Sequence, residues 1–358
     1  MAHKNDIGDR DTKHVGYLDG WRGLAILTLL IGHFFPVPGI NFGTIGVNLF
    51  FVLSGLLMGG LLFEKQEPLA RFYRRRIARI VPAHVSFLLI VTIVVFALDL
   101  PFSPREFFSA LFFANNYIPP TAGPGEAVMP FGHIWSLSVE EHSYIALSLV
   151  AIAGRKRLFS SAWGVGTLFV ASVACILYYQ WLNPPKLAFS LWLHTEAAAF
   201  GLLGTALWVA LGGSGRVRPG RHANDITLTS VAPLLLFAGI ALHWWSVPLA
   251  TQRLLGVGCF VAAICMLTVT KGWFTLILSW APLRQLGVWS YSLYLWQQPF
   301  YLWSHHEQGP PSWASLLLAL MCGLISYYLV ERPARTYLNA HWGVRRPTAT
   351  SLQSSNPA

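Results

Sequence analysis

Apolar stretches long enough to cross a lipid bilayer recur along almost the whole chain, and they constrain the fold more than any other feature. A membrane-crossing helix needs about 20 mostly apolar residues. Charged residues make up only 11% of the 358 residues, against about 25% in a soluble domain. The sequence therefore predicts an all-α integral membrane protein with a bundle of about ten transmembrane helices. The expected spans are 18–36, 44–63, 80–100, 133–153, 158–181, 191–211, 227–247, 251–270, 285–304 and 312–331.

Positive charge is distributed unevenly between the loops that join these spans. With a cytoplasmic N-terminus, the loops on that side carry most of the 25 Lys and Arg residues, and the opposite side carries only Arg105, Lys186 and, at the edge of the eighth span, Arg253. Cytoplasmic loops of membrane proteins are enriched in Lys and Arg. The sequence therefore predicts that both termini are cytoplasmic (N-in and C-in). Because topology explains the net charge of +10, no nucleic-acid partner is expected.

The predicted organisation is one membrane domain with two polar ends. Residues 1–17 form a cytoplasmic N-terminal segment without a cleavage site, and residues 18–335 form the membrane domain. Residues 336–358 form a disordered cytoplasmic tail rich in Ser and Pro. Between the third and fourth spans, Ser103-Pro104-Arg105-Glu106 has the pattern of a helix capping box. The four cysteines lie in apolar runs without the spacing of metal ligands, so no metal site is expected.

The first span carries ionisable residues, which are costly inside a bilayer and therefore mark functional candidates. Arg22 and His33 are separated by about three helical turns, or roughly 16 Å along an α-helix. Both project from one face, with Arg22 near the cytoplasmic boundary and His33 near the middle of the membrane. The alternative is that Arg22 is an interfacial anchor and His33 a hydrogen-bonded packing residue. The occurrence of both on one face favours a catalytic pair.

A cluster of arginines follows the second span. It includes Arg74, Arg75, Arg76 and Arg79. Arginine binds phosphate through two parallel hydrogen bonds, so this cluster could hold the phosphates of a cytosolic donor. Basic residues in this position also determine topology and bind acidic lipid head groups. Composition alone leaves both interpretations open.

Two adjacent carboxylates, Glu140 and Glu141, follow Trp135 at the start of the fourth span. Adjacent helical residues point about 100° apart, so both cannot face one site equally. One of them is expected to orient His33 or to bind a hydroxylated substrate. Proton-coupled transporters and lipid flippases also use buried His, Arg and Glu side chains. The residues alone leave that class of protein open.

Several motifs, in order along residues 17–335, resemble those of the acyltransferase family 3 membrane proteins. They are Leu18-Asp19-Gly20-Trp21-Arg22-Gly23-Leu24-Ala25 through Gly32-His33, Phe50-Phe51-Val52-Leu53-Ser54-Gly55, Arg76-Ile77-Ala78-Arg79 with Pro82, Trp135-Ser136-Leu137-Ser138-Val139-Glu140-Glu141, Ser290-Tyr291-Ser292-Leu293-Tyr294-Leu295-Trp296 and Val330-Glu331-Arg332-Pro333. Each motif is weakly specific by itself, and their order makes the resemblance strong.

The resemblance implies a multi-pass protein of the bacterial inner membrane that transfers an acyl group, most often acetyl from acetyl-CoA, to a hydroxyl. The implied acceptor is a sugar-containing molecule, such as a cell-envelope polysaccharide, glycolipid or lipid-linked oligosaccharide, and some members acylate macrolides instead. Arg22, His33, Arg76 and Arg79 match the functional motif positions of the family. Acyl-CoA and membrane lipids are thus the expected partners besides the acceptor.

The sequence also departs from the family pattern. Gln297 stands where many members have His, Glu196 stands where an Arg often follows Thr, and His142-Ser143 replaces Gln-Phe. These departures concern the acceptor pocket more than the donor chemistry. The residues expected to bind the acceptor are Trp135, Glu141, Tyr291 and Gln297.

The expected mechanism assigns His33 as the general base that removes the proton of the acceptor hydroxyl. Arg22 holds part of the donor or stabilises developing charge, and Glu140 orients His33. The phosphates of acyl-CoA are held by the arginines after the second span, namely Arg76 and Arg79 helped by Arg74 or Arg75.

Overall fold

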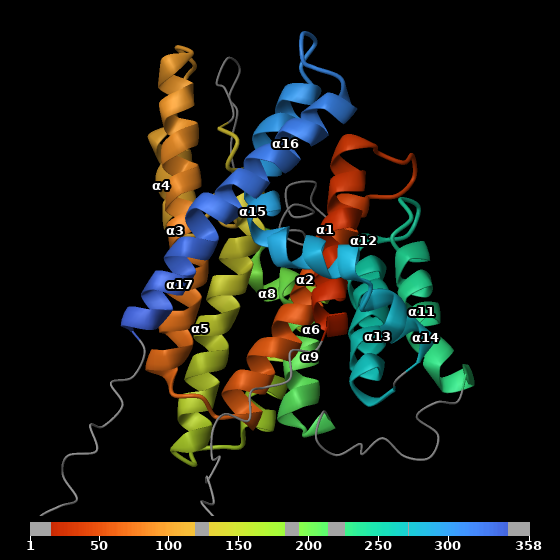
Figure 1. Cartoon of the computed structure of the whole chain (residues 1–358). Helices are drawn as coiled ribbons and strands as arrows, with labels where there is room; N and C mark the ends of the chain where they lie inside the picture. Colours follow the sequence, from red (N-terminus) through yellow and green to blue (C-terminus); the bar gives the residue numbers. More distant parts are fainter. Residues whose placement is uncertain (1–15, 119–128, 183–192, 214–225, 271, 343–358) are drawn as a thin grey trace, which may run out of the picture.

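The computed structural model describes residues 16–118, 129–182, 193–213, 226–270 and 272–342. Within these ranges the protein consists of helices and their connections, and one isolated antiparallel bridge joins Ile40 and Trp244 (Figure 1). The helices are α1 (Gly16–Phe34), α2 (Phe42–Gly59), α3 (Leu69–Ala97), α4 (Pro104–Leu111), α5 (Trp135–Arg155), α6 (Ser161–Leu182), α8 (Thr195–Ala198), α9 (Phe200–Ala210), α11 (Ile226–Ala241), α12 (Leu249–Thr251), α13 (Val257–Val269), α14 (Trp273–Leu278), α15 (Ala281–Ser304), α16 (Ser312–Ser326) and α17 (Arg332–His341).

Five helical segments are long and apolar enough to cross a membrane. They are Phe42–Glu64, Leu69–Ala97, Ser161–Leu182, Leu249–Val269 and Ser312–His341, and two shorter apolar helices cover Phe200–Ala210 and Thr229–Ala241. Each of the ten expected spans overlaps a helix of the structure. The all-helical membrane fold is therefore confirmed for the described residues. The number of ten crossings and the N-in, C-in orientation stay predictions.

Some helices extend beyond the apolar stretches that predicted them. Helix α3 begins at Leu69 rather than near residue 80, so the arginine cluster lies on its first turns. Helix α17 continues to His341, into the segment expected to be a disordered tail. Hydropathy marks only the apolar part of a helix, whereas backbone hydrogen bonding continues through polar residues. The remainder of that tail and residues 1–15 lie outside the described residues.

Helix α4 follows the predicted cap. Ser103 precedes the helix and its hydroxyl accepts a hydrogen bond from the backbone N–H of Glu106, with Pro104 at the first helical position. The Glu106 carboxylate in turn accepts from the backbone N–H of Met129, at 2.9 Å. This contact ties α4 to the segment that leads into α5.

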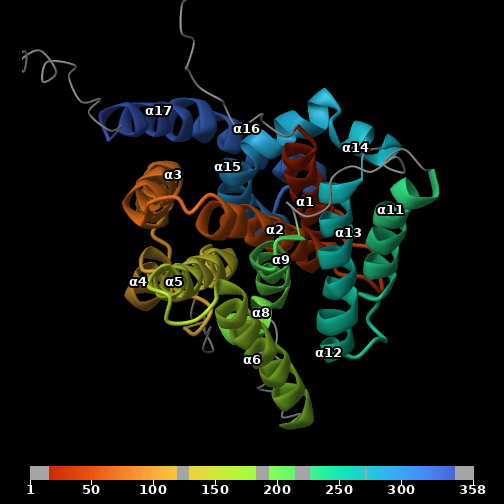
Figure 2. The ribbon, with the colours of Figure 1, turned by 90° about the horizontal axis from the view of Figure 1, so that it is seen from below.

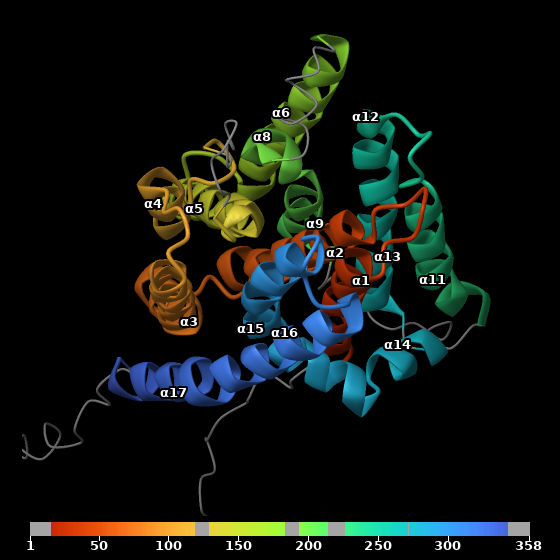
Figure 3. The same ribbon diagram turned by 90° about the horizontal axis from the view of Figure 1, so that it is seen from above.

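Helices α1, α2 and α15 form the centre of the bundle, and the other helices surround them (Figures 2 and 3). The backbones of α1 and α2 touch where they cross, because a Cβ on Gly32 would lie 2.2 Å from the backbone nitrogen of Gly43. Helix α15 approaches α1 as closely, since a Cβ on Gly287 would lie 1.9 Å from the carbonyl oxygen of Asp19. Glycine at these crossings permits the short helix separations that small residues allow in membranes.

The two ends of the bundle differ. The arginine end, at the bottom of Figure 1, is where α2 ends through the π-helical segment Gly60–Glu64 and α3 begins. The loop end, at the top, is where α1 ends and residues 35–41 lead into α2. Two further π-helical segments interrupt long helices at Gln252–Gly256 and Tyr327–Glu331. Such segments often occur at functional sites.

Candidate active site

A polar cavity lies inside the bundle where α1, α2, α3, α5 and α15 meet. Its volume is about 90 Å³, which is room for several water-sized groups because one water needs roughly 10–15 Å³ by this measure. Helix α2 contributes much of the apolar wall through residues such as Val47 and Phe50. The polar side chains that line the cavity are Arg22, Ser54, Arg76, Arg79, Ser136, Glu140, Tyr144, Ser290, Tyr291 and Tyr294.

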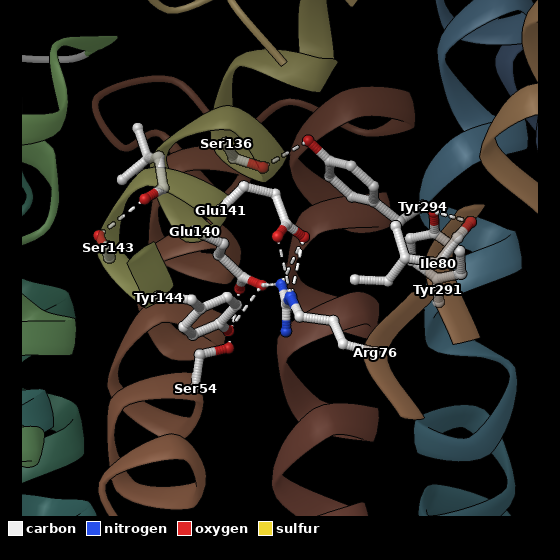
Figure 4. A network of polar contacts seen from close by, with 11 residues as sticks. Ser54, Arg76, Ile80, Ser136, Glu140, Glu141, Ser143, Tyr144, Tyr291 and Tyr294 are labelled. Carbon is white, nitrogen blue, oxygen red and sulfur yellow. Dashed lines mark hydrogen bonds and ion pairs between the residues drawn. The ribbon is translucent and has the colours of Figure 1, made fainter. Parts of the chain in front are cut away.

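Arg76 lies in the middle of this lining and is held by two carboxylates (Figure 4). Its Nε donates to both oxygens of the Glu141 carboxylate, at 2.9 and 3.0 Å. Its Nη2 lies 2.8 Å from Glu141 Oε1 and 3.6 Å from Glu140 Oε2. The guanidinium carbon stacks 3.5 Å from the ring centroid of Tyr144. These contacts occupy the charge of Arg76 and join α3 to α5.

Glu140 contacts different residues from those expected. Its carboxylate accepts hydrogen bonds from the hydroxyls of Ser54, at 2.8 Å, and Tyr144, at 3.0 Å (Figure 4). The prediction that Glu140 orients His33 is not supported by this geometry, because α5 directs Glu140 toward Ser54 on α2. His33 lies near the other end of α1, where its side-chain partner is Gln297.

Two tyrosines of α15 form the opposite wall (Figure 4). The Tyr291 hydroxyl donates to the backbone carbonyl of Ile80 at 3.0 Å, which joins α15 to α3. The Tyr294 hydroxyl pairs with the Ser136 hydroxyl at 2.7 Å and also donates to the carbonyl of His133. Tyr291 was expected to bind the acceptor, and the structure places it in the arginine-lined cavity.

Arg22 and Arg79 supply the remaining positive charge of the cavity. The Nη1 atom of Arg22 donates to Asp19 Oδ1 at 3.0 Å, so one turn of α1 pairs the guanidinium with a carboxylate. In the described part of the chain, Arg79 makes no ion pair. Arg79 is therefore the cavity cation best placed to take an anionic or strongly polar group.

Arg74 and Arg75 lie outside the cavity. Both are exposed at the arginine end of α3. Arg75 forms an ion pair with Glu67 at 3.1 Å, and Arg74 donates to the backbone carbonyl of Trp342 at 3.4 Å. Of the four arginines expected to act together, Arg79 and the ion-paired Arg76 line the cavity, and the other two are exposed.

His33 lies along α1 from Arg22 and does not line the arginine-lined cavity. Its Nδ1 is 2.6 Å from Oε1 of Gln297, a residue that is fully buried on α15. Gln297 Nε2 donates to Gln298 Oε1, which leaves Gln297 Oε1 as the acceptor. His33 Nδ1 therefore carries the hydrogen, and Nε2 carries the lone pair. The imidazole also stacks on Tyr301, with ring centroids 4.4 Å apart.

Sequence reasoning did not single out Tyr144 or Tyr294 as site residues, and the acceptor-binding role expected of Trp135 stays a prediction. Tyr144 follows Glu140 by one helical turn, a spacing that brings side chains together and could have signalled their hydrogen bond. Trp135 packs edge-on against Phe51 and is absent from the cavity lining. The contact between Gln297 and His33 carried no sequence signal, because Gln297 was singled out as a departure from the family pattern and as an acceptor ligand.

No group of three or more His, Cys, Asp and Glu side chains in the described ranges could hold a metal ion. The groups that the cavity and the loop-end half of α1 present are arginines, carboxylates, hydroxyls and an imidazole. Cations, hydroxyl donors and an imidazole with a fixed tautomer are the groups that acyl transfer to an alcohol requires.

Comparison with known proteins also indicates an acyltransferase. A family model described as the acyltransferase domain matches residues 15–332. The chain is 27% identical to O-acetyltransferase OatA of Staphylococcus aureus (strain NCTC 8325 / PS 47), over 89% of this chain and 57% of that protein. It is 28% identical to YrhL of Bacillus subtilis (strain 168), provisionally named a peptidoglycan O-acetyltransferase, over 94% and 56%.

A third relative is BcsY of Komagataeibacter xylinus, provisionally named a membrane-bound transacylase, with 29% identity over 90% of this chain and 83% of that protein. The chain spans a little over half the length of OatA and YrhL. No solved structure matches it. The family match covers most of the chain and includes every residue of the arginine-lined cavity as well as His33 and Gln297. The chain belongs to acyltransferase family 3.

Proposed function

We propose that the protein is an O-acyltransferase of the bacterial inner membrane that moves an acyl group, most often acetyl, from cytosolic acyl-CoA to a hydroxyl of a sugar-containing acceptor. The acceptor class is a cell-envelope polysaccharide or a lipid-linked oligosaccharide. The observation that carries this proposal is the placement, on α1, of a cavity arginine and a histidine whose base nitrogen is fixed by Gln297. The names of OatA and YrhL support transfer of acetyl to oxygen.

On the donor side, the arginine end supplies the charge that acyl-CoA requires. Exposed Arg74 and Arg75 meet the phosphates of the donor, which enters from the cytoplasm. Arg79, with Arg22 beside it, contacts the polar part of the donor inside the cavity. Arg76 supports the cavity wall through Glu140 and Glu141 rather than binding phosphate. In this proposal Arg74, Arg75 and Arg79 remain in the expected donor site, and Arg76 does not.

On the acceptor side, His33 Nε2 removes the proton of the attacking hydroxyl. The acceptor oxygen forms a bond to the thioester carbonyl carbon, the bond from that carbon to sulfur breaks, and the imidazolium returns the proton to the CoA thiolate. The products are the acyl ester and CoA. A neutral imidazole suits this role near pH 7. The flexible arm of CoA spans the distance along α1 between Arg22 and His33, roughly 16 Å.

The decisive experiment uses the full chain reconstituted in nanodiscs with acetyl-CoA labelled on the acetyl group. Release of CoA and transfer of label to an extractable envelope glycan are expected, and both should fall at least about a hundredfold in His33→Ala, because general bases contribute roughly 10²–10⁴ in rate. Label on a macrolide-like small molecule would assign the other acceptor class. Solute or lipid movement without CoA release would identify a transporter and contradict the proposal.

A further inference from the structure

A second cavity opens at the loop end of the bundle, apart from the arginine-lined cavity. Its volume is about 400 Å³, within the range of roughly 300–1,000 Å³ that small-molecule sites occupy. Its lining comes from two segments far apart in sequence, namely Asn41 before α2 and residues 243–252 between α11 and α13. The two loops lie side by side in Figures 1 and 3. No residue of this lining was expected from the sequence to bind a substrate.

The rim of this cavity is a built structure. The backbone N–H of Trp245 donates to the carbonyl of Gly39 at 2.8 Å, and the adjacent bridge joins Ile40 to Trp244. Gly39 has a φ of +89°, and a Cβ there would lie 2.5 Å from the Trp244 ring. Glycine is therefore required where the Trp244 ring covers the loop. Trp244 fixes the rim, which leaves Trp245 as the aromatic residue that lines the cavity.

The floor of the cavity is held in place by a buried polar chain. His243 is 3% exposed, and its Nδ1 donates to the carbonyl of Gly239 at 2.7 Å. Its Nε2 faces the Asn48 amide nitrogen at 3.4 Å, and Asn48 Oδ1 accepts from Arg253 at 2.8 Å. Both nitrogens of the His243 ring are therefore engaged. His243 supports the floor and is not available as a base.

The remaining lining has the chemistry of a site for an uncharged polyhydroxy ligand. The Trp245 side chain is 68% exposed and offers a flat aromatic face. Gln252 Nε2 donates to the carbonyls of Trp244 and Val247, which directs the amide while its Oε1 has no partner among the described residues. Asn41 uses Oδ1 to cap Thr44 N, so its amide N–H groups remain to donate. No Asp, Glu, Lys or Arg lines this cavity, which disfavours an ionic ligand.

The cavity is also adjacent to the base nitrogen of His33. A Cβ on Gly43 would lie 2.9 Å from His33 Nε2 and 3.2 Å from Asn41 Oδ1. His33 Nε2 and the Asn41 side chain therefore both lie close to Gly43. A ligand that hydrogen-bonds to Asn41 would therefore lie near His33.

We propose that this loop-end cavity is the acceptor subsite and that it binds a neutral pyranose unit. Trp245 stacks on the apolar C–H face of the sugar ring, while Asn41 and Gln252 hydrogen-bond its hydroxyls and direct one of them toward His33 Nε2. The delivery of that hydroxyl rests on the proposed function, whereas sugar binding by the cavity does not.

The test measures binding and transfer separately in nanodiscs, with chitotetraose and cellotetraose as probes. Without acetyl-CoA, fluorescently labelled probe is titrated against wild type, Trp245→Ala, Trp245→Phe, Gln252→Leu and Trp313→Ala. Trp313 is the matched control because it is 61% exposed at the start of α16 and lies outside the cavity lining. Expected results are a Kd raised at least tenfold by Trp245→Ala and Gln252→Leu, recovery in Trp245→Phe, and no change in Trp313→Ala.

The same variants are then assayed for transfer from labelled acetyl-CoA. Trp245→Ala should raise the KM for the probe at least tenfold with little change in kcat, and His33→Ala should abolish transfer while probe binding persists. Failure of both probes to bind wild type, or equal effects of Trp245→Ala and Trp313→Ala, would overturn the subsite and indicate membrane-interface tryptophans instead. Probe binding at Trp245 without any CoA release would uphold the subsite and overturn the proposed transfer function.

Discussion

His33 and Gln297 are 264 positions apart in the sequence, yet Nδ1 of one lies 2.6 Å from Oε1 of the other. The hydrogen bond joins the loop-end half of α1 to α15. It makes the Gln297 amide the group that selects which imidazole nitrogen is free to accept a proton. This contact indicates a positioning role for Gln297, and the acceptor-binding role expected from the sequence stays a prediction.

Replacing Gln297 tests this role. Gln297→Leu removes the acceptor for Nδ1–H, so the free imidazole nitrogen is no longer selected. Loss of a buried hydrogen-bond partner costs about 1–3 kcal/mol, and if this cost falls on the transition state, kcat drops roughly 5- to 150-fold with an unchanged KM for acetyl-CoA. Gln297→His, which restores an acceptor nitrogen, should recover part of the rate. Equal kcat values for wild type and Gln297→Leu would contradict the assignment.

Alanine substitutions at Arg76 and Arg79 should distinguish an arginine that stabilises the fold from one that binds the donor. Arg76→Ala leaves Glu140 and Glu141 without their cation, and breaking a buried ion pair costs up to roughly 3–5 kcal/mol. The variant should therefore show a clearly lowered Tm in a thermal unfolding assay. Arg79→Ala removes no ion pair within the described chain, so its Tm should change little while the KM for acetyl-CoA rises at least tenfold. The reverse pattern would restore Arg76 as a phosphate ligand.

Gly43→Ala should impair the base without unfolding the protein. The added methyl group would meet the tip of the His33 ring at 2.9 Å, so the imidazole must tilt away from the acceptor. Transfer activity is expected to fall at least tenfold, measured at equal amounts of monodisperse protein. Gly258→Ala is the control, because a Cβ there has no heavy atom within 4 Å. Normal activity of Gly43→Ala would place the acceptor elsewhere.

Ser54 presents a hydroxyl to the arginine-lined cavity, and its surroundings favour a structural role over that of a covalent acyl carrier. Its hydroxyl donates to Glu140 at 2.8 Å, so Ser54→Ala removes one neutral-to-charged hydrogen bond worth about 1.5–3 kcal/mol. A lowered Tm with activity within a fewfold of wild type is expected. Rapid quenching with labelled acetyl-CoA should leave no label on Ser54. Label at this residue, lost in Ser54→Ala, would contradict the direct transfer described above.

Much of the fold could be predicted because each membrane helix carries its own apolar signal. The expected spans fell on helices even where boundaries differed. The sequence did not predict that α3 begins at Leu69, because Arg74 and Arg75 interrupt the apolar pattern while leaving the helix intact. The short helix α14, Trp273–Leu278, lies in an expected loop, and a six-residue helix is too short for a reliable periodic signal.

The site was predictable as a set of residues and less so as a set of contacts. The rule that adjacent helical residues diverge accounts for only part of the arrangement, because Glu140 meets Ser54 while both Glu140 and Glu141 reach Arg76. It could not identify those partners, because Arg76 lies 65 positions before Glu141. The contact between α1 and α15, and the contact between the two loop-end segments, depend on where helices cross at glycines. The sequence does not specify which helices meet at those glycines.

The contact between the α1 and α2 backbones at Gly32 and Gly43 has a consequence for how such a protein could diversify. No side chain separates the two helices there, so the place of the His33 backbone is set by the packing of the two main chains. Residues 243–252 belong to a different part of the chain, and changes at Trp245 or Gln252 leave that crossing intact. Acceptor range and catalytic chemistry can therefore be altered independently, and an engineer seeking a new acceptor should begin at Trp245 and Gln252.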